Sequence, residues 1–148
     1  GREPRRHGHF TASLDRGAVA DKAFVGGLVG AGSHAIVDAR PPERFAGAGP
    51  EPRPGLAAGH IPGDCNVPQA TLFEPDNSWK RGDALRAAFE AAGVDLAKPM
   101  VTTCGSGVTA AVLAFGAHLI GKEDVRLYDG SWSEWGADPA TPKATGPA

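Results

Sequence analysis

Hydrophobic residues are gathered in short runs along the chain rather than in long stretches. The main runs lie at residues 34–38, 65–67, 100–103 and 125–128, and a shorter apolar step lies at 18–20. Short runs that do not alternate with polar residues are typical of strands covered on both faces, as in a parallel sheet. The pattern therefore predicts a strand at each of these places.

Between these runs, the hydrophobic spacing changes to that of helices. Gly82–Ala92 is the clearest case, because Leu85 and Phe89 share one helical face and Gly93 follows as a stop signal. Further helices are predicted at 21–29 with Asp21 as the cap, at 41–45, at 108–120, and as a last turn at 131–135 with Ser131 as the cap. Strands that alternate with helices indicate an α/β domain, with a mostly parallel sheet of about five strands flanked by helices.

Length and charge restrict the class of protein further. The 148 residues are enough for one domain with its own core. We expect that domain at 10–136, between a flexible basic head at 1–9 and a flexible tail at 137–148. A net charge of −2 lacks the positive excess of a nucleic-acid or membrane-surface binder. No apolar run reaches the roughly 18 residues of a membrane span.

Cysteine and histidine usage argues against disulfide and metal chemistry. Two cysteines, Cys65 and Cys104, are too few for a disulfide scaffold, so we expect free thiols and a reducing, cytoplasmic location. The five histidines show no metal-ligand spacing with cysteine or acidic residues. We therefore expect neither a metal nor an organic cofactor. Cys65 lies in an apolar run without nearby donors and is interpreted as structural.

Cys104 has a different setting, because it stands between a predicted strand and a glycine-containing turn that opens a helix. Ligands of parallel sheets collect at the carboxyl ends of the strands. The helix N-terminus, a nest of loop amides and the hydroxyls of Ser106 and Thr109 would all favour a thiolate there. The competing interpretation is a small buried apolar residue, as free cysteines often are.

Several segments, in the same order along the chain, resemble the signatures of the rhodanese superfamily. They are Val37–Arg40, Gly59–Gly63, Cys104–Ala110 (CGSGVTA) and Tyr128–Trp135 (YDGSWSEW). The cysteine segment resembles the active-site loop of 3-mercaptopyruvate sulfurtransferases. The chain as a whole resembles the C-terminal, catalytic domain of that family, so a rhodanese-like fold is expected.

The resemblance also implies roles for individual residues. Cys104 would take a sulfane sulfur, carry it as a persulfide and pass it to an acceptor, with assistance from Ser106. Arg44 and Arg53 match the substrate-binding arginines of the family, and a guanidinium fork suits a carboxylate. The remaining residues of the active-site loop are Gly105, Gly107, Val108 and Thr109. Scaffold roles are implied for Asp38, Arg40, His60 and Asp129.

The expected reaction moves sulfur from 3-mercaptopyruvate, releasing pyruvate, to a small thiol, to cyanide or to a protein such as thioredoxin. Gly105 and Ser106 stand where thiosulfate-preferring relatives carry basic residues, which argues against thiosulfate as the preferred donor. Two alternatives stay open. One is a thiosulfate:cyanide sulfurtransferase, and the other is a non-catalytic rhodanese module for sulfur relay or protein docking.

Two departures from related proteins bear on these expectations. The two-domain relatives carry an N-terminal rhodanese domain, which we expect to be missing here, with the basic head as the linker. Cysteine phosphatases of the same fold need an arginine where Ala110 stands, and phosphoryl transfer depends on that charge, so phosphatase activity is not expected. Ala110 and Ala111 also stand where a second cysteine is usual.

Overall fold

The computed structural model describes residues 19–48, 55–105 and 108–146, and only the backbone of Val108. One sheet of five strands has the order β1-β5-β4-β2-β3, and all of its pairs are parallel. The strands are β1 (Val19–Ala20), β2 (Ala35–Asp38), β3 (Cys65–Asn66), β4 (Met100–Thr103) and β5 (Val125–Tyr128). The α/β prediction is therefore confirmed.

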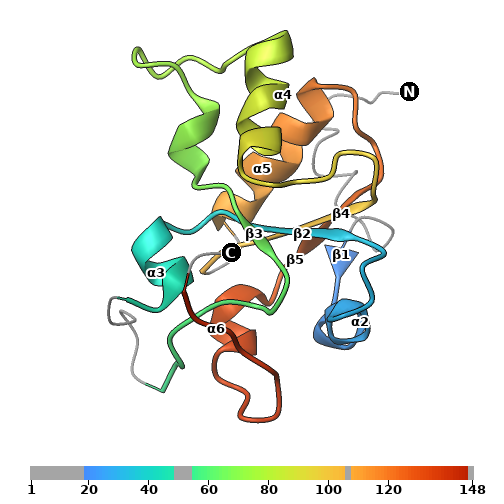
Figure 1. Ribbon diagram of the computed structural model, residues 1–148, viewed down its shortest axis with the longest axis vertical. Helices are drawn as coiled ribbons and strands as arrows, with labels where there is room; N and C mark the ends of the chain where they lie inside the picture. The colour runs from blue at the N-terminus through green and yellow to red at the C-terminus, as the bar shows by residue number, and fades with distance from the viewer. Residues whose placement is uncertain (1–18, 49–54, 106–107, 147–148) are drawn as a thin grey trace, which may run out of the picture.

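Helices cover both faces of this sheet. They are α2 (Lys22–Leu28), α3 (Pro42–Ala46), the 3-10 helix η1 (Gln69–Leu72), α4 (Gly82–Ala91), α5 (Val108–Leu119) and α6 (Ser131–Trp135). Figure 1 shows α4 and α5 on one side of the sheet and α2 and α6 on the other. Asp21 is the predicted cap of α2, since its side chain accepts a hydrogen bond from the Phe24 N–H at 2.8 Å.

Alternate residues of each strand feed two separate hydrophobic clusters. Val37, Met100 and Leu127 face the cluster beneath α4 and α5. Their neighbours Ile36, Val101 and Tyr128 face the other cluster, which contains the two tryptophans of α6. This division follows from the period of two along a strand, and it explains why the runs are apolar throughout.

The strand order places a topological switch point between β2 and β4. The chain leaves β2 toward the β3 edge, whereas it leaves β4 toward β5 on the other side. The segments that follow two such strands diverge and leave a crevice, where ligands of open α/β sheets bind. The segment after β2 contains α3, and the segment after β4 begins at Cys104.

The C-terminal segment differs from the flexible tail expected from the sequence. Residues 137–146 turn back from α6 and form an antiparallel bridge between His60 and Ala144. The Trp135 Nε1–H donates to the Pro142 carbonyl at 2.8 Å, and the Gly146 N–H donates to the Ala46 carbonyl at 2.7 Å. Backbone hydrogen bonds of this kind leave no periodic pattern in the sequence, which is why the sequence of this segment is typical of a flexible tail. The head at 1–9 lies outside the described residues.

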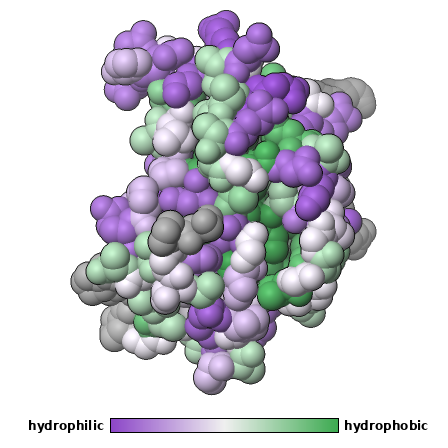
Figure 2. Space-filling model, in the orientation of Figure 1, coloured by the Kyte–Doolittle hydropathy of each residue, from purple (hydrophilic) through white to green (hydrophobic). Residues whose placement is uncertain are grey.

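The surface is of mixed character. Figure 2 shows polar side chains gathered at the α4 end of the viewed face and a band of apolar surface running down its middle. Leu119, at the end of α5, is a large apolar residue with an exposed fraction of 48%. Within the described part of the chain, no helix is both long and apolar enough to cross a bilayer.

Candidate active site

Cys104 lies directly after β4 and is almost completely buried, with 1% of its surface exposed. The turn that it opens is fixed from behind by α6. The Trp132 N–H donates to the Cys104 carbonyl at 2.8 Å, and the Ser133 N–H donates to the Gly105 carbonyl at 3.0 Å. The carbonyls of Cys104 and Gly105 are therefore both held by hydrogen bonds to α6.

Ser131 contacts the Cys104 thiol and was missed by the sequence analysis as a site residue. Its Oγ lies 3.8 Å from the Cys104 Sγ, and it also donates to the Tyr128 carbonyl at 3.1 Å. The predicted capping role is wrong, because Gly130 precedes α6 at the cap position and Ser131 has a φ of 55°. The signal that could have revealed it is its place just after β5, at the same sheet edge as Cys104.

Arg44 reaches the Cys104 turn from α3, across the switch point. A Cβ built on Gly105 would lie 3.0 Å from Arg44 Nη2 and 3.5 Å from Nη1. The guanidinium therefore occupies the place where any other residue at position 105 would project its side chain. Arg44 is partly exposed, so this positive charge can meet a ligand from solvent while it lies against the turn that Cys104 opens.

A second arginine is already neutralised within the domain. Arg40 forms a two-pronged ion pair with Asp38, with Nε and Nη2 at 3.1 and 2.9 Å from Oδ2, and both side chains are 1% exposed. The Arg40 Nη2 also donates to the Gly59 carbonyl at 2.6 Å, and the guanidinium lies 4.6 Å from the ring centre of Trp132. This pair joins β2 to the loop before His60 and to α6, in agreement with the scaffold role that the resemblance implies.

His60 packs under α3 rather than against the thiol. Its ring stacks on Phe45 with a centroid separation of 3.9 Å, and its Nδ1 lies 2.7 Å from the Phe45 carbonyl. On its other side, His60 Nε2 is 4.0 Å from Asp64 Oδ1. Burial, and secondarily the nearby Asp38 carboxylate, raises the pKa of Asp64 well above its usual range. The histidine therefore supports the helix that carries Arg44.

The second cysteine lies away from this cluster. Cys65 is half-buried on the edge strand β3, where its Sγ faces Gly93. Burial, and to a lesser extent the nearby Asp64 carboxylate, raises the pKa of the Cys65 thiol. A raised thiol pKa reduces the thiolate fraction at neutral pH, which fits the structural interpretation of this residue.

The structure describes some of the predicted site residues and not others. Cys104, Gly105 and Arg44 are brought together at the switch point, and Thr109 lies in the first turn of α5, partly exposed. Arg53, Ser106, Gly107 and the side chain of Val108 lie outside the described residues. Asp129, directly after β5, is exposed. Among the described residues, no cluster of histidine, cysteine and acidic side chains could hold a metal ion.

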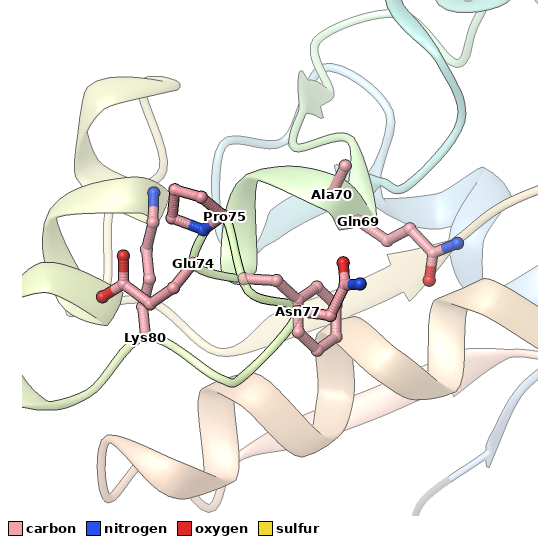
Figure 3. A pocket seen from close by; sticks show the side chains of 7 residues that line it. Gln69, Ala70, Glu74, Pro75, Asn77 and Lys80 are labelled. Carbon is pink, nitrogen blue, oxygen red and sulfur yellow. The ribbon is translucent and has the colours of Figure 1, made fainter.

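One pocket that the described residues form lies away from this cluster. It has a volume of about 630 Å³ and lies beside η1, lined by Gln69, Phe73, Glu74, Asn77 and Lys80 among others. In Figure 3 the labelled side chains come from η1 (Gln69 and Ala70) and from the segment that follows it (Glu74, Pro75, Asn77 and Lys80). It contains neither a thiol nor Arg44, so it is not the candidate active site.

Comparisons with known proteins agree with this architecture. The model of the rhodanese-like domain family matches residues 23–138. Rat 3-mercaptopyruvate sulfurtransferase is 42% identical over 135 residues, covering 91% of this chain and 46% of the relative. The mitochondrial thiosulfate/3-mercaptopyruvate sulfurtransferase 1 of Arabidopsis thaliana is 44% identical over 106 residues, covering 72% of this chain and 28% of the relative.

A solved structure agrees as well. SseA from Escherichia coli, described as a 3-mercaptopyruvate sulfurtransferase with the rhodanese fold, superposes with a TM-score of 0.68 at 39% identity, over 81% of this chain and 44% of SseA. The chain thus spans less than half the length of each of these three proteins. The matched segment contains both the Cys104 turn and the α3 arginine. The chain belongs to the rhodanese family.

Proposed function

We propose that this chain transfers sulfur from 3-mercaptopyruvate, with Cys104 as the nucleophile and persulfide carrier. The observation that carries the proposal is the guanidinium of Arg44 beside Gly105, the residue that follows the buried Cys104, at the switch point of the sheet. A donor that fits must present a transferable sulfur and, a few bonds away, an anionic group for a guanidinium. 3-Mercaptopyruvate has both, because its thiol and its carboxylate are separated by two carbons.

The reaction balances with the residues of this chain. The Cys104 thiolate attacks the donor sulfur, a sulfur–sulfur bond forms, and the carbon–sulfur bond breaks. The electron pair of that bond leaves on the enolate of pyruvate, which takes up a proton at carbon and departs as pyruvate. An acceptor thiolate or cyanide then attacks the outer sulfur of the persulfide and restores the Cys104 thiolate.

The surroundings of Cys104 support the anionic forms in this cycle. The Ser131 hydroxyl donates its proton to the Tyr128 carbonyl in the thiol form, and because its Oγ lies 3.8 Å from the sulfur it can turn that proton toward a thiolate. The N-terminus of α5 contributes partial positive charge. We assign the loop residues Gly105, Ser106, Gly107, Val108 and Thr109 to the anion cradle, with Ser106 assisting proton transfer. Arg53 is proposed to bind the donor together with Arg44, in accordance with the resemblance.

Thiosulfate is the alternative donor, since the name of one relative contains both donors. Thiosulfate-preferring relatives carry a basic residue where Gly105 stands, according to the resemblance. In this chain the Arg44 guanidinium occupies the space that such a side chain would need, and this favours mercaptopyruvate as the donor. A non-catalytic role in relay or docking is the second alternative. It is favoured only by the length of the relatives, of which this chain matches less than half.

Two further proposals concern the surroundings of the protein. Thioredoxin, or a small thiol, is proposed as the physiological acceptor, because either delivers the thiolate that discharges a persulfide. A reducing, cytoplasmic location is proposed because both cysteines are free and one of them is the candidate nucleophile.

Intact mass spectrometry tests the function directly. The protein is incubated with 3-mercaptopyruvate or with thiosulfate and weighed before and after addition of cyanide. The expected result is a gain of one sulfur atom with mercaptopyruvate, little gain with thiosulfate, and loss of the gained sulfur to cyanide. Cys104→Ser should abolish the gain, whereas the matched variant Cys65→Ser should retain it. Loading by neither donor would refute the proposal, and loading by thiosulfate alone would favour the alternative donor.

A further inference from the structure

The C-terminal segment Thr141–Gly146, which we call the strap, connects α6, which holds the Cys104 turn, with α3, which carries Arg44. It begins at α6, where the Thr141 hydroxyl donates to the Trp135 carbonyl at 2.6 Å. It ends at α3, where the Gly146 N–H donates to the Ala46 carbonyl at 2.7 Å. Figure 1 shows this dark red segment rising from α6 to α3.

The strap is seated on His60 by paired backbone hydrogen bonds. The His60 N–H donates to the Ala144 carbonyl at 2.8 Å, and the Ala144 N–H donates to the His60 carbonyl at 2.9 Å. The His60 ring in turn stacks on Phe45, the neighbour of Arg44 in α3. His60 therefore holds α3 with its side chain and the strap with its backbone.

Two glycines leave space for the strap to lie close. Gly59 has a φ of 121°, and a Cβ placed on it would collide with the Ala144 carbonyl. Gly47, which ends α3 with a φ of 76°, would place a Cβ 3.1 Å from Thr145 Cγ2. Both positions combine left-handed backbone with close approach of the strap, so the contact is built into the chain rather than incidental.

Helix α3 depends on such external support. It has five residues, and no side chain caps its N-terminus at Pro41. A helix of this length has almost no stability of its own, so tertiary contacts determine where its side chains point. The direction of Arg44 is therefore set by what holds the end of α3, namely His60 and the strap.

We propose that the strap positions Arg44 over the Cys104 turn, through Ala46 and His60. The strap starts at the helix whose N–H groups hold the Cys104 and Gly105 carbonyls, and it ends at the helix that carries Arg44. One short segment thereby fixes the distance between the nucleophile and the anion-binding arginine. The inference rests on the proposed anion-binding role of Arg44.

The test compares two alkylating reagents on the Cys65→Ser background, so that Cys104 is the thiol that reacts. Iodoacetate carries a carboxylate for Arg44, whereas iodoacetamide is its neutral counterpart. The rate constant for iodoacetate divided by that for iodoacetamide reports how well Arg44 is positioned, and its measurement does not require sulfur transfer. Arg44→Gln sets the value of the ratio without the guanidinium.

Ala144→Pro removes the N–H that donates to His60, and Ala144→Ser is the matched control that keeps it. We expect Ala144→Pro to lower the ratio about five- to tenfold, as for one weakened charge-assisted hydrogen bond. The ratio should fall toward the Arg44→Gln value, and the double variant should fall no further. A chain that ends at Pro142 provides a second disruption if Ala144→Pro does not fold.

The outcomes separate the inference from the function on which it rests. An unchanged ratio in a folded Ala144→Pro protein or in the shortened chain would overturn the positioning role, as would an equal loss in Ala144→Ser. An unchanged ratio in Arg44→Gln would instead overturn the anion-binding role of Arg44. Sulfur loading by mass spectrometry then reports independently whether the transfer itself occurs.

Discussion

Gly105→Ala is the smallest change that tests how Arg44 and the Cys104 turn are fitted together. The new Cβ would lie 3.0 Å from Arg44 Nη2, closer than ordinary carbon–nitrogen contact, whereas its 3.6 Å distance from Cζ is ordinary contact. The backbone at Gly105 is not left-handed, and the obstructing atoms are at the end of a flexible side chain. We therefore expect the variant to fold normally and the guanidinium to retreat by a few tenths of an ångström.

The size of the effect follows from the bond that is weakened. A hydrogen bond to a charged group contributes about 1.5–3 kcal/mol, and we expect the retreat of Arg44 to cost about half of this. A loss of about 1 kcal/mol corresponds to a roughly fivefold weaker interaction. The donor carboxylate does not take part in bond breaking, so the loss should be equal in the ground state and the transition state. The KM for 3-mercaptopyruvate should rise about fivefold while kcat stays within about twofold.

The assay is steady-state release of pyruvate with a small thiol in excess as acceptor. Gly26→Ala is the matched control, because its Cβ would meet nothing within 4 Å in α2. An unchanged KM in Gly105→Ala would show that Arg44 does not bind the donor. A fall in kcat at constant KM would show instead that position 105 acts on the nucleophile.

Further predictions concern the residues around the turn. Arg40→Leu leaves the Asp38 carboxylate buried without its partner. We expect the free energy of unfolding, measured by urea denaturation, to fall by about 3–5 kcal/mol. A loss under about 1 kcal/mol would contradict a structural role for this ion pair. Burial raises the pKa of Asp64 in the folded protein. Protonated Asp64 therefore contributes to the free energy of unfolding in full below the unfolded-state pKa of about 4, and this contribution is lost as the pH rises through the folded-state pKa. Asp64→Asn should therefore gain stability over the parent protein as the pH rises from about 4 to 7, and a constant difference across that range would refute this account. Ser131→Gly relieves a positive φ, so the melting temperature should stay the same or rise. The variant also removes the hydroxyl near Cys104, so sulfur loading should slow about three- to tenfold. Unchanged loading would exclude a role for the hydroxyl.

Local patterns in the sequence account for the elements of this fold. The apolar runs at 100–103 and 125–128 coincide with β4 and β5, and the helix predicted at 82–92 begins and ends within one residue of α4. Such runs are readable because a strand covered on both faces must be apolar at every position. The place of Cys104 between β4 and α5 follows from the same local reading.

Long-range pairing could not be predicted in this way. The strand order decides that the segments after β2 and β4 face each other, and nothing local in either strand specifies its neighbour. The resemblance assigned Arg44 to the substrate, but the contact of Arg44 with Gly105 was not predicted. The strap was missed because its contacts are made by backbone groups, which all residue types share.

The central position of β4 has a consequence for how the domain opens. β4 is hydrogen-bonded on both sides, to β2 and to β5, whereas β1 and β3 are two-residue strands at the edges of the sheet. Edge strands of this length separate in local fluctuations, while a central strand exchanges its amide hydrogens only when the whole domain unfolds. The base on which the Cys104 turn stands should thus be the slowest-exchanging part of the molecule, so that fraying at the edges leaves the thiol in place.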